Sequence, residues 1–198
     1  MSVKNVVKIE ERAKVGQDLF YGLTGRRNYR RAFPYLLEAA EAGNVHCRNL
    51  VGYCYELGLG TAVDEALAYA WYRKAADSEH KEAMGNLALL YENGRGVKKS
   101  LKKAFNLYER AAKLGDAWAQ CNLAICLMEG KGIKMDPTEG VRWMRISAKN
   151  GDPVAQYNLA QEYLNGTYVR KNKSYARIWT TRAAERGHRL AKRLLKQI

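Results

Sequence analysis

Apolar residues recur along the chain at helical spacing, in short runs that glycine-containing turns separate. The stretch 81–115 is the clearest example, because its apolar positions follow the helical period of about 3.6 residues twice. Leu87 and Tyr91 belong to the first run, and Ala104 and Tyr108 belong to the second. A Gly-x-Gly turn joins the runs, so the stretch predicts two helices connected as a hairpin.

The same pattern repeats every 36 residues. Shifting the sequence by this period aligns glycines in three columns. The columns are Gly43, Gly115, Gly151 and Gly187 after the second run; Gly22, Gly58, Gly94, Gly130 and Gly166 after the first; and Gly60, Gly96 and Gly132 two residues later. Glu79 interrupts the first of these columns and Tyr168 ends the third. A fixed period of this length is typical of stacked helix pairs.

We therefore predict an all-α fold in which five helix-pair repeats of 36 residues stack into one solenoid domain over residues 1–198. The expected repeats lie at about 8–43, 44–79, 80–115, 116–151 and 152–187. The segment 188–197 carries Ala191 and Leu195 in the columns of a first helix, and we expect it to form a capping helix.

Polar residues before each run predict where the helices begin. Their side chains can accept a hydrogen bond from a free backbone N–H of the first turn. The candidates are Asn28, Asp64, Ser100, Asp136 and Asn172 before the second helices, and Asn44, His80, Asp116, Asp152 and His188 before the first. Two of the three histidines are thus assigned to helix starts. Pro34, which lies inside a second helix, is expected to kink or shorten that helix.

The four cysteines favour buried free thiols. Cys47 and Cys54 are seven residues apart on one predicted helix, which separates their Cα atoms by about 10 Å. A disulfide needs Cα atoms within about 7 Å. No Cys-x-x-Cys spacing supports a metal site. The N-terminus lacks the apolar segment of a signal peptide, and no apolar run approaches the ~20 residues of a membrane span, so we expect a cytoplasmic protein.

The repeat closely resembles the Sel-one-like repeat. The shared pattern is Ala-x-x-x-Leu-Ala/Gly-x-x-Tyr-x-x-Gly-x-Gly-Val, then a capping residue and a helix that ends Ala-Ala-x-x-Gly; the best copy is AMGNLALLYENGRGV with ERAAKLG. The resemblance covers nearly the whole chain. It implies a right-handed αα superhelix related to the tetratricopeptide repeat, acting as an adaptor that holds a partner protein or peptide in a concave groove. The cysteine-rich secreted branch of the family has a bridging pair in every repeat, which this chain lacks.

If the first helices line that groove, as the resemblance implies, positions between the packing columns should face the partner. These are Tyr53, Asn86, Leu89, Trp118, Asn122, Ile125, Tyr157 and Asn158. Trp118 stands out, because its column elsewhere holds His46, Glu82 and Val154 and so does not require a large ring. Two alternatives remain: Trp118 packs on the neighbouring repeat, and the asparagine column ties one helix to the next loop. Trp71, Trp143 and Trp179 share a second-helix column and are predicted to be core.

The net charge is +14, and part of it recurs with the repeat. Arg26, Arg27, Lys98, Lys99, Lys134, Arg170 and Lys171 occupy two adjacent columns in the loops between paired helices. Stacked repeats would align them as a basic ridge, interrupted at Ala62-Val63. The ridge fits an acidic protein, nucleic-acid phosphates or an anionic membrane surface, and equally a solvated edge. No nucleic-acid-binding motif accompanies it, so nucleic acid is the less favoured partner.

No catalytic pattern is present. The sequence lacks Gly-x-Ser-x-Gly, His-Glu-x-x-His and a phosphate-binding glycine loop. The Gly-x-Gly elements recur in each well-formed repeat, which marks them as turns. We therefore expect no enzyme activity and no cofactor.

Overall fold

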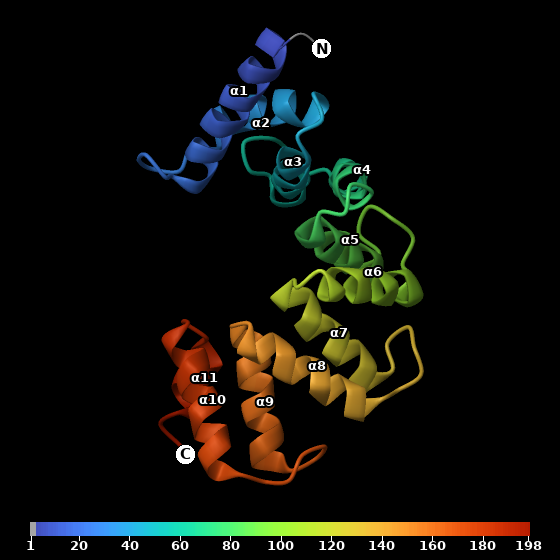
Figure 1. Ribbon diagram of the computed structural model, residues 1–198, viewed down its shortest axis with the longest axis vertical. Helices are drawn as coiled ribbons and strands as arrows, with labels where there is room; N and C mark the ends of the chain where they lie inside the picture. The colour runs from blue at the N-terminus through green and yellow to red at the C-terminus, as the bar shows by residue number, and fades with distance from the viewer. Residues whose placement is uncertain (1–2) are drawn as a thin grey trace. The chain divides into compact units, whose positions relative to one another are not determined.

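The computed structural model describes the backbone of residues 3–198 and the side chains of residues 7–198. This part of the chain contains helices and turns and no strand, as the sequence predicts for an all-α fold (Figure 1). The helices are α1 (Val3–Tyr21), α2 (Tyr29–Glu41), α3 (Val45–Leu57), α4 (Glu65–Ala76), α5 (Lys81–Asn93), α6 (Leu101–Lys113), α7 (Ala117–Glu129), α8 (Pro137–Lys149), α9 (Pro153–Asn165), α10 (Lys173–Glu185) and α11 (Arg189–Leu194).

The helices group into two compact units, Met1–Ser100 with α1–α5 and Leu101–Ile198 with α6–α11. Within each unit every helix packs against the next one along the chain, and in the second unit α7 also contacts α9 directly. Helices α3, α5, α7 and α9 are the predicted first helices of their repeats, and α4, α6, α8 and α10 are the second. The unit boundary falls inside the third repeat, and the single domain over 1–198 stays a prediction.

Side-chain caps fix the helix starts at the predicted positions. Asn44, His80, Asp116, Asp152 and His188 each accept a hydrogen bond from the backbone N–H three residues later, and so do Asn28, Asp64, Asp136 and Asn172. The two histidines use Nδ1 as the acceptor, at 3.3 Å from the Ala83 nitrogen and 3.2 Å from the Ala191 nitrogen. Their assignment to helix starts is confirmed.

The glycine columns mark backbone that other residues adopt poorly. Gly43, Gly115, Gly151 and Gly187 all have positive φ after the second helices, and Glu79 in the same column is the sole non-glycine with positive φ among the described residues. Gly60, Gly96 and Gly132 have a further requirement. A Cβ at these glycines would overlap the backbone carbonyl of the first residue of the preceding second helix, which is Tyr29, Glu65 and Leu101 respectively. The third column therefore docks each loop onto the helix pair before it.

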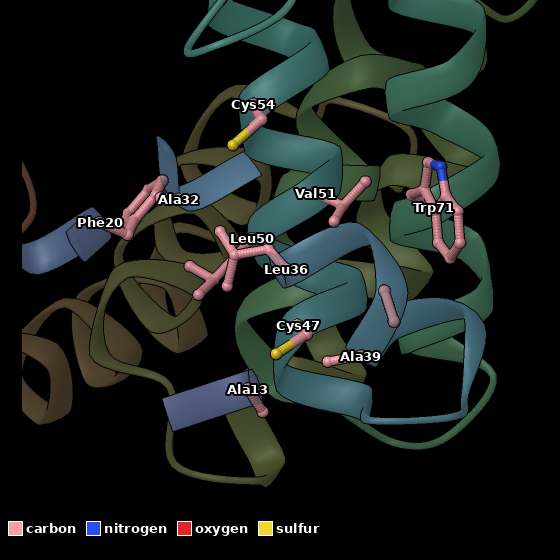
Figure 2. Close-up of a cluster of buried hydrophobic side chains, with 11 residues drawn as sticks. Ala13, Phe20, Ala32, Leu36, Ala39, Cys47, Leu50, Val51, Cys54 and Trp71 are labelled. Carbon is pink, nitrogen blue, oxygen red and sulfur yellow. The ribbon is translucent and has the colours of Figure 1, made fainter. Parts of the chain in front are cut away.

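Small residues let the helices approach closely in the core. A Cβ at Gly52 of α3 would lie 2.7 Å from the ring of Tyr72, which is fully buried in α4 and donates a hydrogen bond of 2.7 Å to Glu56. Figure 2 shows the buried cluster around α3, with Phe20 and Trp71 at opposite sides of the view. Burial raises the pKa of the Cys54 thiol in this cluster to about 12, so this thiol stays protonated.

The four cysteines are free and buried, as expected. Two other details differ from the expectations. Pro34 lies inside α2, yet α2 keeps the 13 residues that most of the other helices have, so the predicted shortening is wrong, while the alternative of a kink stays a prediction. Trp71 and Trp179 are buried, but Trp143 is half-buried and packs against the edge of the core of the second unit.

The capping helix is shorter than predicted, because α11 ends at Leu194. It nevertheless covers the last repeat. Ala191 is fully buried against Ala183 and Ala184 of α10, and Tyr157 and Leu195 pack around this small cluster. The buried face of α11 thus shields apolar surface that α9 and α10 would otherwise expose.

Candidate functional site

In the first unit, a hollow of about 340 Å³ lies beside the first helices. Two of the predicted groove residues, Tyr53 and Asn86, line it. The others are Phe20, Tyr21, Arg27, Tyr29, Asn49 and Leu50. Tyr21 and Tyr53 are exposed, and the Phe20 ring lies 5.1 Å from the Tyr21 ring and 6.2 Å from the Tyr53 ring, edge to face in both cases. The wall of the hollow is therefore aromatic, with one guanidinium from Arg27.

Asn86 ties two first helices together. Its Nδ2 donates a 3.1 Å hydrogen bond to the Oδ1 of Asn49, so the two side chains, which both line this hollow, join α5 to α3. This contact supports the structural alternative for Asn86, although the residue still borders the open space. Leu89, also on α5, is half-buried.

A chain of polar rings runs along the starts of the first helices in the same unit. His46 Nδ1 lies 3.4 Å from His80 Nε2, and His46 Nε2 lies 3.3 Å from the Tyr21 hydroxyl. Because His80 Nδ1 accepts the N–H of Ala83, the neutral ring carries its proton on Nε2 and donates to His46. Glu82 also lies 3.3 Å from His80 Nδ1, as a partner for the protonated form. Burial lowers the pKa of His46, and the nearby Glu82 carboxylate partly opposes this shift.

In the second unit, Trp118 is half-buried on α7. Its ring meets the buried Tyr108 ring of α6 edge to face at 5.9 Å. This contact supports the alternative in which Trp118 packs on the neighbouring repeat, although the side chain is not fully buried. The side-chain amide of Asn122 donates a 2.9 Å hydrogen bond to the backbone carbonyl of Trp118, so this amide is bonded within its own helix.

A second hollow of about 340 Å³ lies between α7 and α9 in this unit. Ile125 and Asn158 line it, as the sequence predicts for groove residues, together with Met128, Glu129, Met144, Gln161, Glu162 and Tyr168. Tyr157 lies elsewhere on α9. Its ring stacks on His188 at 4.7 Å, and its hydroxyl accepts a 2.7 Å hydrogen bond from Gln161. Tyr157 is therefore largely engaged with the cap.

All seven residues of the predicted basic ridge are exposed. They do not share one environment. Arg27 lines the aromatic hollow of the first unit and donates from Nε to the Tyr21 carbonyl at 3.3 Å. Arg170 and Lys171 line a different hollow, beside α8 and α10. The ridge as one continuous surface stays a prediction.

Sequence reasoning missed several residues that line the hollows. Phe20, Tyr21 and Tyr29 belong to the first repeat, whose loop departs most from the repeat pattern. Tyr168 lines the hollow between α7 and α9 and also the hollow beside α8 and α10, and the sequence had marked it as the residue that ends the third glycine column.

The described residues contain no group of three or more histidine, cysteine or acidic side chains that could hold a metal ion. Over the same part of the chain, no helix combines the length and the apolar character needed to cross a bilayer. The candidate site is thus a surface of aromatic, amide and charged side chains, which is suited to binding.

Helix pairs of constant period, with capped starts and glycine-docked loops, define an αα-repeat protein. Comparison with protein families gives the type of repeat: the Sel1 repeat model matches residues 13–44, 45–80, 81–116, 119–152 and 153–188. The chain belongs to the Sel1 repeat family. This family is a non-catalytic helical scaffold whose members generally mediate protein–protein interactions.

Solved structures agree with this assignment. A Sel1 repeat protein from Oxalobacter formigenes is 30% identical with a TM-score of 0.87, over 98% of this chain and 78% of that chain. The c5321 protein, a protective antigen present in uropathogenic Escherichia coli strains, displays an SLR fold and is 26% identical with a TM-score of 0.80; the match covers 94% of this chain and 40% of that chain. Helicobacter pylori cysteine rich protein B shares the fold at 24% identity and a TM-score of 0.52, over 65% of this chain and 92% of that chain. Comparison with curated protein sequences gave no match.

Proposed function

We propose that this protein is a non-enzymatic adaptor that binds a partner protein or peptide along its first helices. The observation that carries the proposal is the position and the partial burial of Trp118. The same column holds His46, Glu82 and Val154 in other repeats and so does not require a large ring, yet a tryptophan that is only half-buried occupies it on α7. Such rings anchor interfaces, because they bury a large apolar area at a small cost in conformational entropy.

The two hollows beside the first helices supply the other elements of a binding surface. Tyr53 in the first unit and Ile125 in the second offer apolar contacts, and Asn158 offers an amide that can pair with a peptide backbone. An interface of this kind, with apolar anchors and a polar rim, is typical of protein–protein recognition. The proposed groove residues remain Tyr53, Asn86, Leu89, Trp118, Asn122, Ile125, Tyr157 and Asn158, with Trp118 as the anchor.

The substitution Trp118→Ala tests the anchor. Affinity capture from the native host, followed by mass spectrometry, should recover a partner with the unmodified protein and lose it at least tenfold with this variant. The edge contact with Tyr108 means that some stability is lost as well, roughly 1 kcal/mol. A loss of partner caused only by lower stability must therefore be separated from loss of the anchor itself.

Trp143→Ala is the matched control, since Trp143 is also a half-buried tryptophan of the second unit but lies on a second helix. It should cost similar stability and retain the partner. Equal recovery by Trp118→Ala and the unmodified protein, or equal loss by both variants, contradicts the proposal.

We place this function in the cytoplasm. The support is that all four cysteines are free and buried, which suits a compartment where thiols stay reduced. Fractionation of host cells with an antibody against the protein tests the placement, and recovery outside the cytoplasm contradicts it.

A further inference from the structure

The loop between α9 and α10 departs from the glycine-docked form of the other loops. Gly60, Gly96 and Gly132 each bring their loop against the first residue of the preceding second helix, at a distance that leaves no room for a Cβ. The equivalent position in the fifth repeat is Tyr168, which lacks the positive φ of those glycines. A tyrosine cannot make the same approach, so this loop must take another path past the start of α8.

A hollow of about 520 Å³ lies at this loop. Its walls come from α8, the end of α9, the loop and the start of α10, and its volume falls in the range of small-molecule sites, about 300–1,000 Å³. We name it the Tyr168 pocket and define it by Arg145, Tyr163, Tyr168, Arg170, Lys171 and Tyr175. The loop between α9 and α10, in which Tyr168 replaces the docking glycine, is therefore the loop that borders this hollow.

Three tyrosine rings border the Tyr168 pocket. Tyr163 and Tyr175 lie 5.3 Å apart between ring centroids with a tilt of 34° between their planes. Tyr168 and Tyr175 are 45% and 51% exposed, so their rings are open to a ligand. No core position requires these exposed rings, and flat aromatic surfaces of this kind accept another ring by stacking.

Three cations surround the same rings. Arg145, Arg170 and Lys171 are exposed, and all three line the pocket, whereas none of the described residues that line it is acidic. Glu162 lies at the same loop, where it accepts a 3.3 Å hydrogen bond from the Tyr168 backbone N–H and so holds the loop. The cations exceed this one carboxylate, and the pocket therefore favours a ligand that carries both negative charge and planar rings.

We propose that the Tyr168 pocket binds single-stranded nucleic acid. A strand alternates phosphates with bases, so the three cations meet phosphates while a base stacks on the exposed tyrosines. A duplex keeps its bases stacked on one another and offers no free ring. An acidic peptide supplies charge but no regular planar group. This site goes beyond the groove function and does not depend on it.

The experiment measures binding of a fluorescently labelled oligothymidylate to the full chain at rising salt. Binding should weaken as salt rises, because each neutralised phosphate releases counterions. Tyr168→Ala should weaken binding roughly 5- to 150-fold, the range for one stacked base, while Tyr168→Trp should restore it. Tyr175→Ala gives a second variant, and circular dichroism verifies that each protein is folded.

The charged columns provide a matched control. Arg170→Gln with Lys171→Gln removes two cations of the pocket, and Lys98→Gln with Lys99→Gln removes the equivalent pair beside the glycine-docked loop of the third repeat. The first pair should lower the salt slope by roughly 0.7 for each phosphate that is no longer neutralised, and the second pair should leave affinity unchanged.

Several outcomes overturn the proposal: no binding at low salt, equal binding of a strand that lacks its bases, equal or tighter binding of the duplex, displacement of the strand by an acidic peptide of equal charge, or binding of free nucleotide only. An equal effect of the Lys98 and Lys99 substitutions also overturns it, because that result indicates attraction by net charge alone.

Discussion

At the scale of single residues, Gly115 and Gly132 have the same backbone conformation but different structural roles. Gly115 has φ of 82° and nothing within 4 Å of an added Cβ, whereas Gly132 has φ of 77° and no room beside the Leu101 carbonyl. The sequence places both in regularly spaced columns and predicts turns at both. Only the packing shows that Gly132 also docks one loop on another helix.

We predict that Gly132→Ala destabilises the protein more than Gly115→Ala. Both variants force alanine into the left-handed region, at roughly 1–2 kcal/mol. Gly132→Ala must also move its loop away from Leu101, which we expect to bring the loss to about 3 kcal/mol or more. Urea unfolding measures the difference.

Gly25→Ala is the control, since Gly25 has no neighbour within 4 Å and no positive φ, and it should leave stability equal or slightly higher. Equal losses at Gly115 and Gly132 would show that docking adds nothing.

At the scale of elements, histidines at helix starts link the first helices to one another. The sequence identified His80 and His188 as caps from their positions alone. It did not indicate that His46 would connect Tyr21 to His80, because this contact depends on how α1, α3 and α5 bring their ends together.

This connection predicts a pH dependence of stability. The pKa of His46 lies below its ordinary value of 6.5 in the folded protein, so the unfolded chain takes up a proton more readily. The contribution of His46 to the free energy of unfolding is therefore fully present above about pH 6.5, and it is lost as the pH falls below that value. The groups that face His46 are Tyr21, His80 and Glu82.

Melting temperatures between pH 7.5 and 5.5 test this dependence. His46→Gln cannot titrate, so it should reduce the loss of stability on acidification by roughly a few tenths of a kcal/mol, a small value because the ring is only half-buried. His188→Asn retains a cap and removes a histidine from the other unit, and this control should leave the part of the slope due to His46 intact. An unchanged slope in His46→Gln would mean that other groups cause any dependence.

At the scale of the whole molecule, the repeat and the compact units divide the chain differently. The boundary between the units follows Ser100, inside the third repeat, which contributes α5 to one unit and α6 to the other. Repeat proteins gain stability from the interfaces between neighbouring repeats, so we predict that the two units unfold as one solenoid domain.

Leu36→Ala tests this cooperativity, because Leu36 is fully buried in the first unit and its loss costs roughly 2–5 kcal/mol. In a single domain, hydrogen exchange in α7 and α9 should accelerate together with exchange in α3. Leu159→Ala, at a fully buried position of the second unit, should have the reciprocal effect on α3. Exchange that accelerates only in the unit carrying the substitution would establish two independent domains.

The sequence alone determined the frame of this protein. Helix pairs, their period, their capping residues and their turn glycines are local features, because helical spacing and backbone conformation depend on residues a few positions apart. This is why Asp152 as a cap and Gly151 as a turn could be predicted from one chain.

The tertiary structure decided how the exposed side chains are used. Whether Asn86 holds a neighbouring helix, whether Trp118 is half-covered by Tyr108, and whether Arg170 stands beside tyrosines all depend on contacts between residues far apart in sequence. A column of like residues predicts like positions, but not the neighbours that each position meets. The clearest case is Tyr168: the sequence showed that it breaks the glycine column, and only the packing of α8, α9 and α10 showed that a pocket opens there.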